Sequence, residues 1–185
     1  MNVYDFDGTL YRGDSTADFL RWCVSRHPHA ALALPRAGVA AAACFGPHLI
    51  DKTQFKRNLY RLLRSVPDID REIDRFWAVH EDRIAGPCKP APGDLVISAS
   101  PEFLLEGPCR RRGLDLIASQ VDPHTGRILS PNCSGHEKVL RYRARFADTP
   151  IDTFYSDSKN DAPLAALANS AFLVNIPRNI IRPWN

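Results

Sequence analysis

The stretch VYDFDGTL, residues 3–10, decides the fold of this chain. Its β-branched and aromatic residues favour an extended strand, which Gly8 and the residue after it end at once. Asp5 and Asp7 are therefore expected at the carboxyl end of a short buried strand, where ligands bind in open α/β sheets. Burying two carboxylates so close together is costly unless a cation or a chemical task offsets the repulsion. The stretch alone leaves two interpretations open, a functional pair of acids or an Asp-Gly turn.

Length and composition bound the class of protein. The 185 residues, 44% of them hydrophobic, fit one domain with a modest insertion and argue against general disorder. A formal net charge of +3 is mildly basic, so we expect no nucleic-acid partner. The five cysteines are odd in number and form no C-x-x-C pair, which favours a reducing, cytoplasmic location over disulfides or a zinc site.

Neither a signal peptide nor a transmembrane helix is expected. The chain enters its first strand immediately, which leaves no room for a leader segment. The most apolar stretch, residues 30–45, is interrupted by Pro35 and Gly38 and is too broken to span a bilayer. We predict that this stretch forms a helix starting near Pro35.

The order of the elements predicts an α/β fold with an insertion. Residues 12–85 show only helical patterns, and the proline- and glycine-rich segment 86–93 is typical of a hinge or domain boundary. Beyond it we predict strands at 94–98, 114–118, 151–155 and 171–174. Between them we predict helices at 101–112, 134–146 and 163–168, with a hairpin at 121–129. This alternation favours a Rossmann-like parallel sheet with helices on both faces and an all-helical block inserted after the first strand.

Two further segments carry candidate phosphate-binding groups. Ser98-Ala99-Ser100-Pro101 lies where a strand ends and a helix begins, so Ser100 is a candidate helix cap and the free backbone N–H groups there can bind an anion. Residues 134–137 resemble a capping box, which places Lys138 in the first turn of its helix. A lysine is electrostatically unfavourable at that position unless an anion lies nearby. An ordinary capped helix and a solvated lysine are the alternatives.

Asp157 and Asp161 follow the predicted strand 151–155 and add two acids at a strand end. Mg²⁺ is held by few carboxylates together with waters and substrate oxygens. A helix N-terminus rich in Asp and Asn is the alternative explanation. It does not account well for four acids at the ends of two strands.

Taken in order, these segments resemble the four motifs of the haloacid dehalogenase-like (HAD) hydrolase superfamily. The helical insertion is similar to the cap of the branch that contains phosphoserine phosphatases and phosphatidylglycerophosphatase-like enzymes. Two departures stand out. Phosphoserine phosphatases usually have Ser where this chain has Gly8, and their glycine-rich second motif is replaced here by Ser98-Ala99-Ser100.

The resemblance implies a Mg²⁺-dependent phosphomonoester hydrolase with a nucleophile at Asp5 and an acid/base at Asp7. It also implies a discontinuous core of residues 1–11 and 89–185 and a cap of residues 12–88 with a hinge. Thr9 is predicted to orient Asp7, and Asp161 to bind the metal through water or to orient its ligands. The predicted catalytic residues are Asp5, Asp7, Ser98 and Lys138. The predicted substrate-binding residues are Thr9, Ser98, Ala99, Lys138, Asp14 and Arg57, and the predicted metal ligands are Asp5, Asp7, Asp157 and Asp161.

The substrate is the open part of the prediction. Asp14 and Arg57 echo the substrate-binding acid and cap arginine of phosphoserine phosphatases. A small soluble phosphorylated metabolite is favoured as the partner, because the small alanines of residues 30–45 pack well between helices and offer little area for membrane binding. For Asp14 the sequence favours the alternative explanation, the N-cap of a helix beginning near Ser15. The alternatives are a lipid phosphate, met at a membrane by an apolar surface at residues 30–45, and a non-catalytic binding module on the same fold. The oligomeric state is not predicted.

Overall fold

The computed structural model describes residues 1–33, 39, 44 and 52–184 of the chain. Its centre is a six-stranded sheet with the strand order β3-β2-β1-β4-β5-β6. The strands are β1 (Val3–Tyr4), β2 (Leu95–Pro101), β3 (Asp115–Ser119), β4 (Ile151–Ser156), β5 (Ala168–Asn175) and β6 (Ile180–Pro183). The first five run parallel, and β6 pairs antiparallel with β5 at the edge. The predicted Rossmann-like parallel sheet is thus confirmed.

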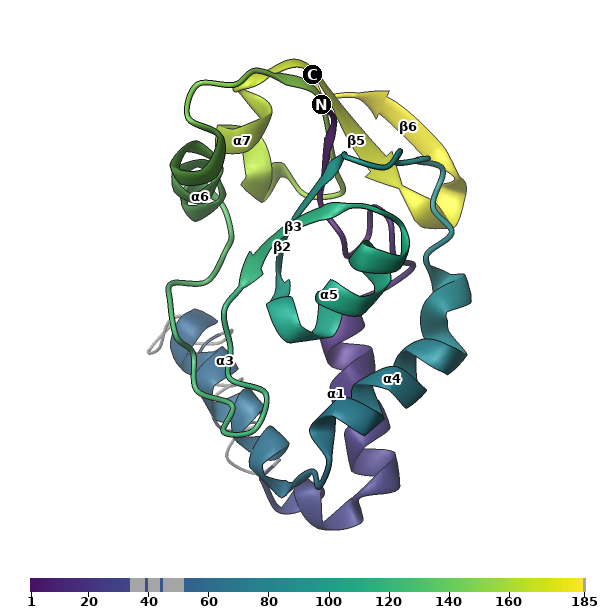
Figure 1. The fold of residues 1–185 in the computed structure, drawn as a ribbon, viewed down its shortest axis with the longest axis vertical. Coiled ribbons are helices and arrows are strands. Elements are labelled where there is room, and N and C mark those ends of the chain that lie inside the picture. The colour runs from purple at the N-terminus through teal and green to yellow at the C-terminus, as the bar shows by residue number, and fades with distance from the viewer. Residues whose placement is uncertain (34–38, 40–43, 45–51, 185) are drawn as a thin grey trace.

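Helices cover both faces of the sheet, as predicted (Figure 1). One face packs on α6 (His136–Phe146) and α7 (Ala162–Ala165), and the other packs on α5 (Glu102–Arg111). Side chains alternate along each strand, so Val3 joins the cluster of α6 and α7 while its neighbour Tyr4 joins that of α5. The short β1 is therefore buried on both sides, and the residues directly after it are held in place.

The described part of the insertion consists of helices joined by short 3₁₀ segments. Its helices are α1 (Ser15–Arg26), α3 (Lys52–Tyr60) and α4 (Ile69–His80). The 3₁₀ segments are Pro28–Ala33, Arg61–Ser65 and Glu81–Arg83. In Figure 1 these helices lie at the end of the molecule away from both chain termini. Most of the predicted helix at 30–45 lies outside the described residues. The division into a core and a cap stays a prediction.

The insertion shares a hydrophobic core with the sheet. Trp77 of α4 packs edge-on against Phe6 and Tyr11, with ring centroids 6.1 Å and 5.8 Å away, and its indole N–H donates to the Leu104 carbonyl of α5 at 2.6 Å. The two ends of the insertion are also tied together, because the Arg12 N–H donates to the Arg83 carbonyl at 2.8 Å. These contacts fix α1 and α4 against the sheet end where the predicted site lies.

Two predicted helix starts are wrong. Ser100 does not cap a helix, because β2 continues to Pro101 and α5 begins at Glu102 without a side-chain cap. Competition from the carboxylate of Asp7 explains this, since the Ser100 hydroxyl donates to it instead.

The capping box at residues 134–137 is not formed either. The N-cap of α6 is Gly135, whose φ of 56° suits glycine, and it makes no side-chain cap hydrogen bond. The Glu137 carboxylate is drawn instead to Arg141, 2.9 Å away and one turn further on. Lys138 nevertheless lies in the first turn of α6, as predicted.

The carboxyl-terminal elements differ in extent from the prediction. The helix predicted at 163–168 is the single turn α7, and the strand predicted at 171–174 extends over the whole of β5. The antiparallel β6 escaped prediction because its residues are exposed and show no alternation of apolar and polar side chains. The predicted hairpin at 121–129 is present as one antiparallel bridge between Val121 and Ile128.

All five cysteines are buried and free, which agrees with the expectation that they form no disulfides. Among the described residues, no helix combines the length and apolarity needed to cross a membrane.

Candidate active site

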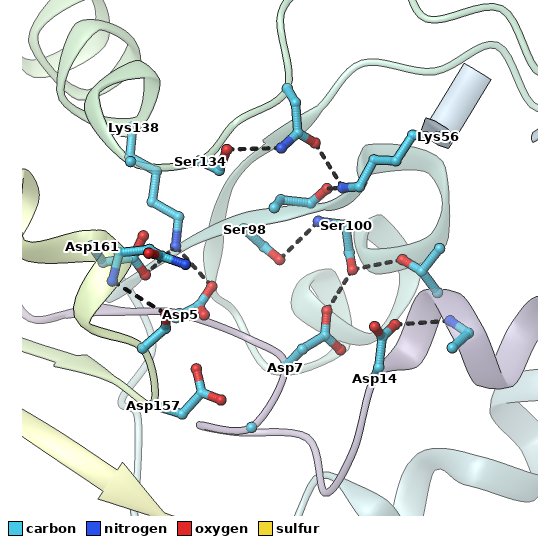
Figure 2. Close-up of a pocket in the computed structure, with 18 of the residues that line it drawn as sticks. Asp5, Asp7, Asp14, Lys56, Ser98, Ser100, Ser134, Lys138, Asp157 and Asp161 are labelled. Atoms are coloured by element: carbon cyan, nitrogen blue, oxygen red, sulfur yellow. Dashed lines mark hydrogen bonds and ion pairs between the residues drawn. The ribbon is translucent and has the colours of Figure 1, made fainter. Parts of the chain in front are cut away.

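The predicted motifs meet at the carboxyl ends of β1, β2 and β4, around a pocket of about 780 Å³ (Figure 2). The predicted residues that line it are Asp5, Asp7, Asp14, Ser98, Ala99, Lys138, Asp157 and Asp161. Helices α1 and α3 of the insertion close the opposite side through Thr16, Phe55, Lys56 and Tyr60, among others. The pocket is therefore formed jointly by the sheet and the insertion.

Asp5, Lys138 and Asp161 form a buried ion-pair network. The Lys138 ammonium donates to the Asp5 carboxylate at 2.9 Å and to Asp161 at 2.7 Å, and its side chain is only 2% exposed. Ser156 donates a further hydrogen bond to Asp161 at 2.9 Å. Burial alone would lower the pKa of Lys138, but the two facing carboxylates outweigh burial and raise it. The lysine is therefore charged, and it holds the Asp5 carboxylate toward the pocket.

Asp157 faces the same space, and among the described residues it forms no ion pair like that between Lys138 and Asp5. Burial, reinforced by the negative charges of Asp5 and Asp161, raises the pKa of Asp157 to about 6. Gly8 lies directly against it, with a φ of 72°, and a Cβ at this position would come within 2.1 Å of Asp157 Oδ2. Glycine therefore suits this position, because its backbone conformation is one that other residues rarely adopt and a Cβ would force the Asp157 side chain to shift.

The donors present fit a hard divalent cation. Within the described residues, no group of three or more His, Cys, Asp or Glu side chains forms a metal cage. Mg²⁺ needs no such cage, because it binds through one or two carboxylates while waters and substrate oxygens complete the octahedron. Burial raises the pKa of Asp5, and burial followed by the negative charge of Asp5 raises that of Asp157, so a bound cation would relieve an existing electrostatic cost.

Asp7 points to the other side of the pocket, where Figure 2 shows its hydrogen bond to Ser100. Its Oδ1 accepts from the Ser15 backbone N–H at 2.6 Å, and its Oδ2 accepts from the Ser100 hydroxyl at 2.5 Å. Burial and the nearby charge of Asp14 raise the pKa of Asp7 to about 7. A carboxyl group with such a pKa can both give and take a proton near neutral pH.

The remaining predicted residues occupy varied positions. Ser98 is buried at the pocket wall, and its hydroxyl oxygen accepts from the Ser100 N–H at 3.1 Å, which leaves its own proton available. Asp14 caps α1 by accepting from the Ala17 N–H at 2.8 Å, so its predicted alternative role is confirmed.

Thr9 is fully buried, and its hydroxyl has no hydrogen-bond partner in the part of the chain that is described. Ser15 and Ser100 perform the orientation of Asp7 that was predicted for Thr9.

Arg57 is exposed on α3 and is not among the described residues that line the pocket. Its neighbour Lys56 enters instead, and its ammonium donates to the Ala99 carbonyl at 2.8 Å and to the Asn132 side chain at 2.7 Å. The prediction of Arg57 rests on its resemblance to the cap arginine of phosphoserine phosphatases, and such a resemblance does not show which of two adjacent helix positions faces the pocket. Several polar residues line the pocket without having been predicted as site residues. Ser100, Ser134, Ser158 and Asn160 lie in or between the motifs already singled out, whereas Thr16, Lys56, Tyr60 and Asn132 lie outside them.

The fold and the site together define an α/β protein in which two acids follow the first strand of a parallel sheet. The sequence matches the haloacid dehalogenase-like hydrolase family over residues 3–166, so the chain belongs to this family. The resemblance of the four motifs is confirmed.

Solved structures agree with this assignment at the level of fold. A protein of unknown function from Bordetella pertussis Tohama I has a TM-score of 0.71 and 22% sequence identity, with 92% of this chain and 87% of that chain covered. A probable phosphoserine phosphatase from Vibrio cholerae has a TM-score of 0.62 and 14% identity, with 92% and 55% covered. A structure described as a phospho-aspartyl intermediate analogue of phosphoserine phosphatase has a TM-score of 0.55 and 14% identity, with 91% and 83% covered. The present chain thus spans about half the length of the Vibrio protein.

Proposed function

We propose that this chain is a Mg²⁺-dependent phosphatase that hydrolyses phosphate monoesters through an aspartyl-phosphate on Asp5. The observation that carries the proposal is the opposed arrangement of two acids on one strand end (Figure 2). Asp5 is held by the buried ammonium of Lys138, whereas Asp7 is held by hydrogen bonds on the other side and has a pKa of about 7. One carboxylate is placed to attack, and the other to exchange protons.

Asp5, Asp157 and the main-chain carbonyl of Asp7 would hold the metal. When bound, Mg²⁺ would offset the negative charges of the nucleophile and the phosphoryl group. Asp161 is already engaged by Lys138 and Ser156, which supports a role in orienting the lysine and the ligands around it.

In the first step the Asp5 carboxylate oxygen bonds to phosphorus as the bond to the leaving oxygen breaks. Asp7 donates its proton to that oxygen, so the product leaves as a neutral alcohol. In the second step Asp7 takes a proton from a water molecule, whose oxygen bonds to phosphorus and displaces Asp5. Lys138 and Ser98 would stabilise the phosphoryl oxygens throughout.

We propose a small soluble phosphorylated metabolite as the substrate. The side of the pocket that would receive the alcohol portion is lined by Asp14, Lys56 and Tyr60, together with the apolar side chains of Phe55 and Leu59. This mixture of one acid, one amine and an apolar wall suits a small polar alcohol with an apolar part. We assign to Lys56 the part that was predicted for Arg57, because Lys56 is the residue that lines the pocket. The competing proposal of a lipid phosphate depended on residues 30–45, most of which lie outside the described residues.

A panel of phosphate esters tests the proposal. We expect the purified chain to hydrolyse p-nitrophenyl phosphate and at least one metabolite phosphate with Mg²⁺, and to stop when EDTA is added. Asp5→Asn, which keeps the size of the side chain, is the matched control and should fall by at least about 10³-fold. Binding of phosphate esters without any turnover would support a binding module instead. Turnover only with phospholipid vesicles would overturn the soluble substrate.

A further inference from the structure

Strand β2 departs from regular pairing at the edge of the site. Ser98 pairs with Ala118, but the next paired residue on β2 is Pro101, opposite Ser119, so Ala99 and Ser100 form a bulge. Bulges occur beside active sites, where they redirect a side chain. Here the bulge turns the Ala99 carbonyl toward Lys56 and the Ser100 hydroxyl toward Asp7.

The contacts of Ser100 form a directed chain of hydroxyl groups. Its hydroxyl donates to Asp7 Oδ2 at 2.5 Å, and the Thr16 hydroxyl lies 2.7 Å from its oxygen. A serine hydroxyl has a single proton. Because Ser100 gives that proton to the carboxylate, Thr16 must be the donor to Ser100. The chain therefore runs from α1 of the insertion through the bulge to Asp7, and Ser100 and Thr16 are both buried.

We propose that Ser100 is a positioning residue that fixes the Asp7 carboxyl group toward the leaving oxygen, with Thr16 orienting Ser100. This inference rests on the proposed function, because it assigns a task to the acid/base of that reaction. The Ser15 N–H holds one oxygen of Asp7 and Ser100 holds the other, so rotation of the carboxyl group would break at least one buried hydrogen bond. Each carboxylate oxygen keeps a second lone pair, so the group can still carry its proton.

The proposal predicts an effect that depends on the leaving group. p-Nitrophenolate departs readily without a proton, whereas phenolate is a poorer leaving group and gains more from protonation. The two esters have closely similar shapes, so a general loss of packing would affect them alike. Loss of the positioning of Asp7 should affect phenyl phosphate more, since only that ester depends strongly on the acid.

The experiment compares kcat/KM for phenyl phosphate and p-nitrophenyl phosphate in the Mg²⁺-loaded protein. For Ser100→Ala we expect a loss of about 10–100-fold with phenyl phosphate and of less than about 3-fold with p-nitrophenyl phosphate, since a displaced catalytic group can cost about 10²-fold. Ser100→Thr, which keeps the hydroxyl, should restore the wild-type ratio of the two values. Ser119→Ala is the matched control, because it removes a buried hydroxyl that donates to the Ala99 carbonyl of the same bulge but is not among the described hydrogen-bond partners of Ser100 or Asp7; it should change both values by the same factor.

Thr16→Val tests the same chain from its other end and should show the same dependence on leaving group, with a smaller loss. It decides the matter if Ser100→Ala does not fold. If Ser100→Ala loses kcat/KM equally on both esters, the positioning role is overturned, although the phosphatase activity of the wild type still stands. The same holds for an equal loss in Thr16→Val when only that variant folds. A wild-type protein inactive on both esters would instead overturn the proposed function, and this inference with it.

Discussion

The two sides of the pocket are built by different means. On the side proposed to bind phosphate, Asp5 and Asp161 follow strands β1 and β4, Lys138 comes from α6, and opposite charges hold the three within hydrogen-bond distance. On the leaving-group side, Asp7 and Ser100 are held by hydroxyl and backbone groups that involve the insertion and a bulge. In the proposed function, opposite charges therefore position the nucleophile, whereas irregular backbone and the helices α1 and α3 position the groups around the leaving oxygen.

The largest effect should follow loss of the buried lysine. Lys138→Met would leave Asp5 and Asp161 facing each other without a counter-charge, and removing one partner of a buried ion pair typically costs about 3–5 kcal/mol. Urea unfolding should show this loss of stability, and turnover should fall to background. Lys159→Met, at an exposed lysine after the same strand as Asp161, is the control. A cost below about 1 kcal/mol, as expected for an exposed pair, would show that the network does not hold the phosphate side together.

Asp157→Ala and Asp161→Ala should separate metal binding from structure. Asp161 is a partner of Lys138, so Asp161→Ala should lower the free energy of unfolding. Asp157 is the proposed direct ligand, so Asp157→Ala should leave the fold intact but raise the Mg²⁺ concentration needed for half-maximal activity. The increase should exceed the roughly 10–100-fold effect that is typical of losing an indirect contact to a metal. Urea unfolding and Mg²⁺ titration of both variants measure the two effects. If the Mg²⁺ requirement of Asp157→Ala is unchanged, the assignment of the metal ligands is wrong.

The stability of the metal-free protein should fall as the pH rises from about 5 to about 8. Burial raises the pKa of Asp5, and the pKa values of Asp7 and Asp157 are raised to about 7 and about 6. The folded state thus favours the protonated carboxyl groups, which contributes to the free energy of unfolding. This contribution is complete below the pKa of the unfolded chain, near pH 4, and is lost as the pH rises through about 6 and 7. Lys138, whose pKa is raised, stays charged across this range.

Thermal melting in EDTA measures this slope. The melting temperature should drop by several degrees between the two pH values, and Mg²⁺ should raise it more at pH 8 than at pH 5. Asp157→Asn should flatten the slope. A melting temperature that is constant, or that rises with pH, would contradict the picture of uncompensated acids at this strand end.

The smallest effect concerns the leaving-group side. Lys56→Ala should raise KM for the best metabolite phosphate several-fold and leave the KM for p-nitrophenyl phosphate nearly unchanged, because Lys56 lies where the alcohol portion would bind. Arg57→Ala is the matched control on the same helix, and it should change neither value because Arg57 is exposed. Steady-state kinetics with both esters measure this effect. If Arg57→Ala raised KM for the metabolite phosphate and Lys56→Ala did not, Arg57 would bind the substrate, as the sequence suggested.

The same contrast explains what could be predicted from sequence. Asp5, Asp7, Lys138 and Asp157 follow strands or open a helix, and such positions can be located from local patterns alone. The parallel sheet with helices on both faces follows from the same alternation of elements. All of these predictions use only patterns among residues that are close together in the sequence.

The roles of Ser100 and Lys56 depend on tertiary contacts instead. The local signal of Ser100 before Pro101 is that of a helix cap, and a carboxylate 93 residues away in sequence outcompetes it. Lys56 reaches the Ala99 carbonyl, 43 residues away, only because α3 packs beside the bulge. Neither partner can be inferred from spacing along the chain.

The covalent intermediate on Asp5 is the central claim, and trapping it is the most direct test. Wild type, Asp7→Asn and Asp5→Asn would be mixed with radiolabelled phosphate ester and Mg²⁺, quenched in acid within one turnover and mapped by peptide. We expect label on Asp5 in the wild type and no label in Asp5→Asn. With a good leaving group, Asp7→Asn should carry equal or greater label on Asp5, because Asp7 no longer activates the hydrolytic water. Label on another residue, or none in the first two proteins while the wild type turns over, would contradict the account.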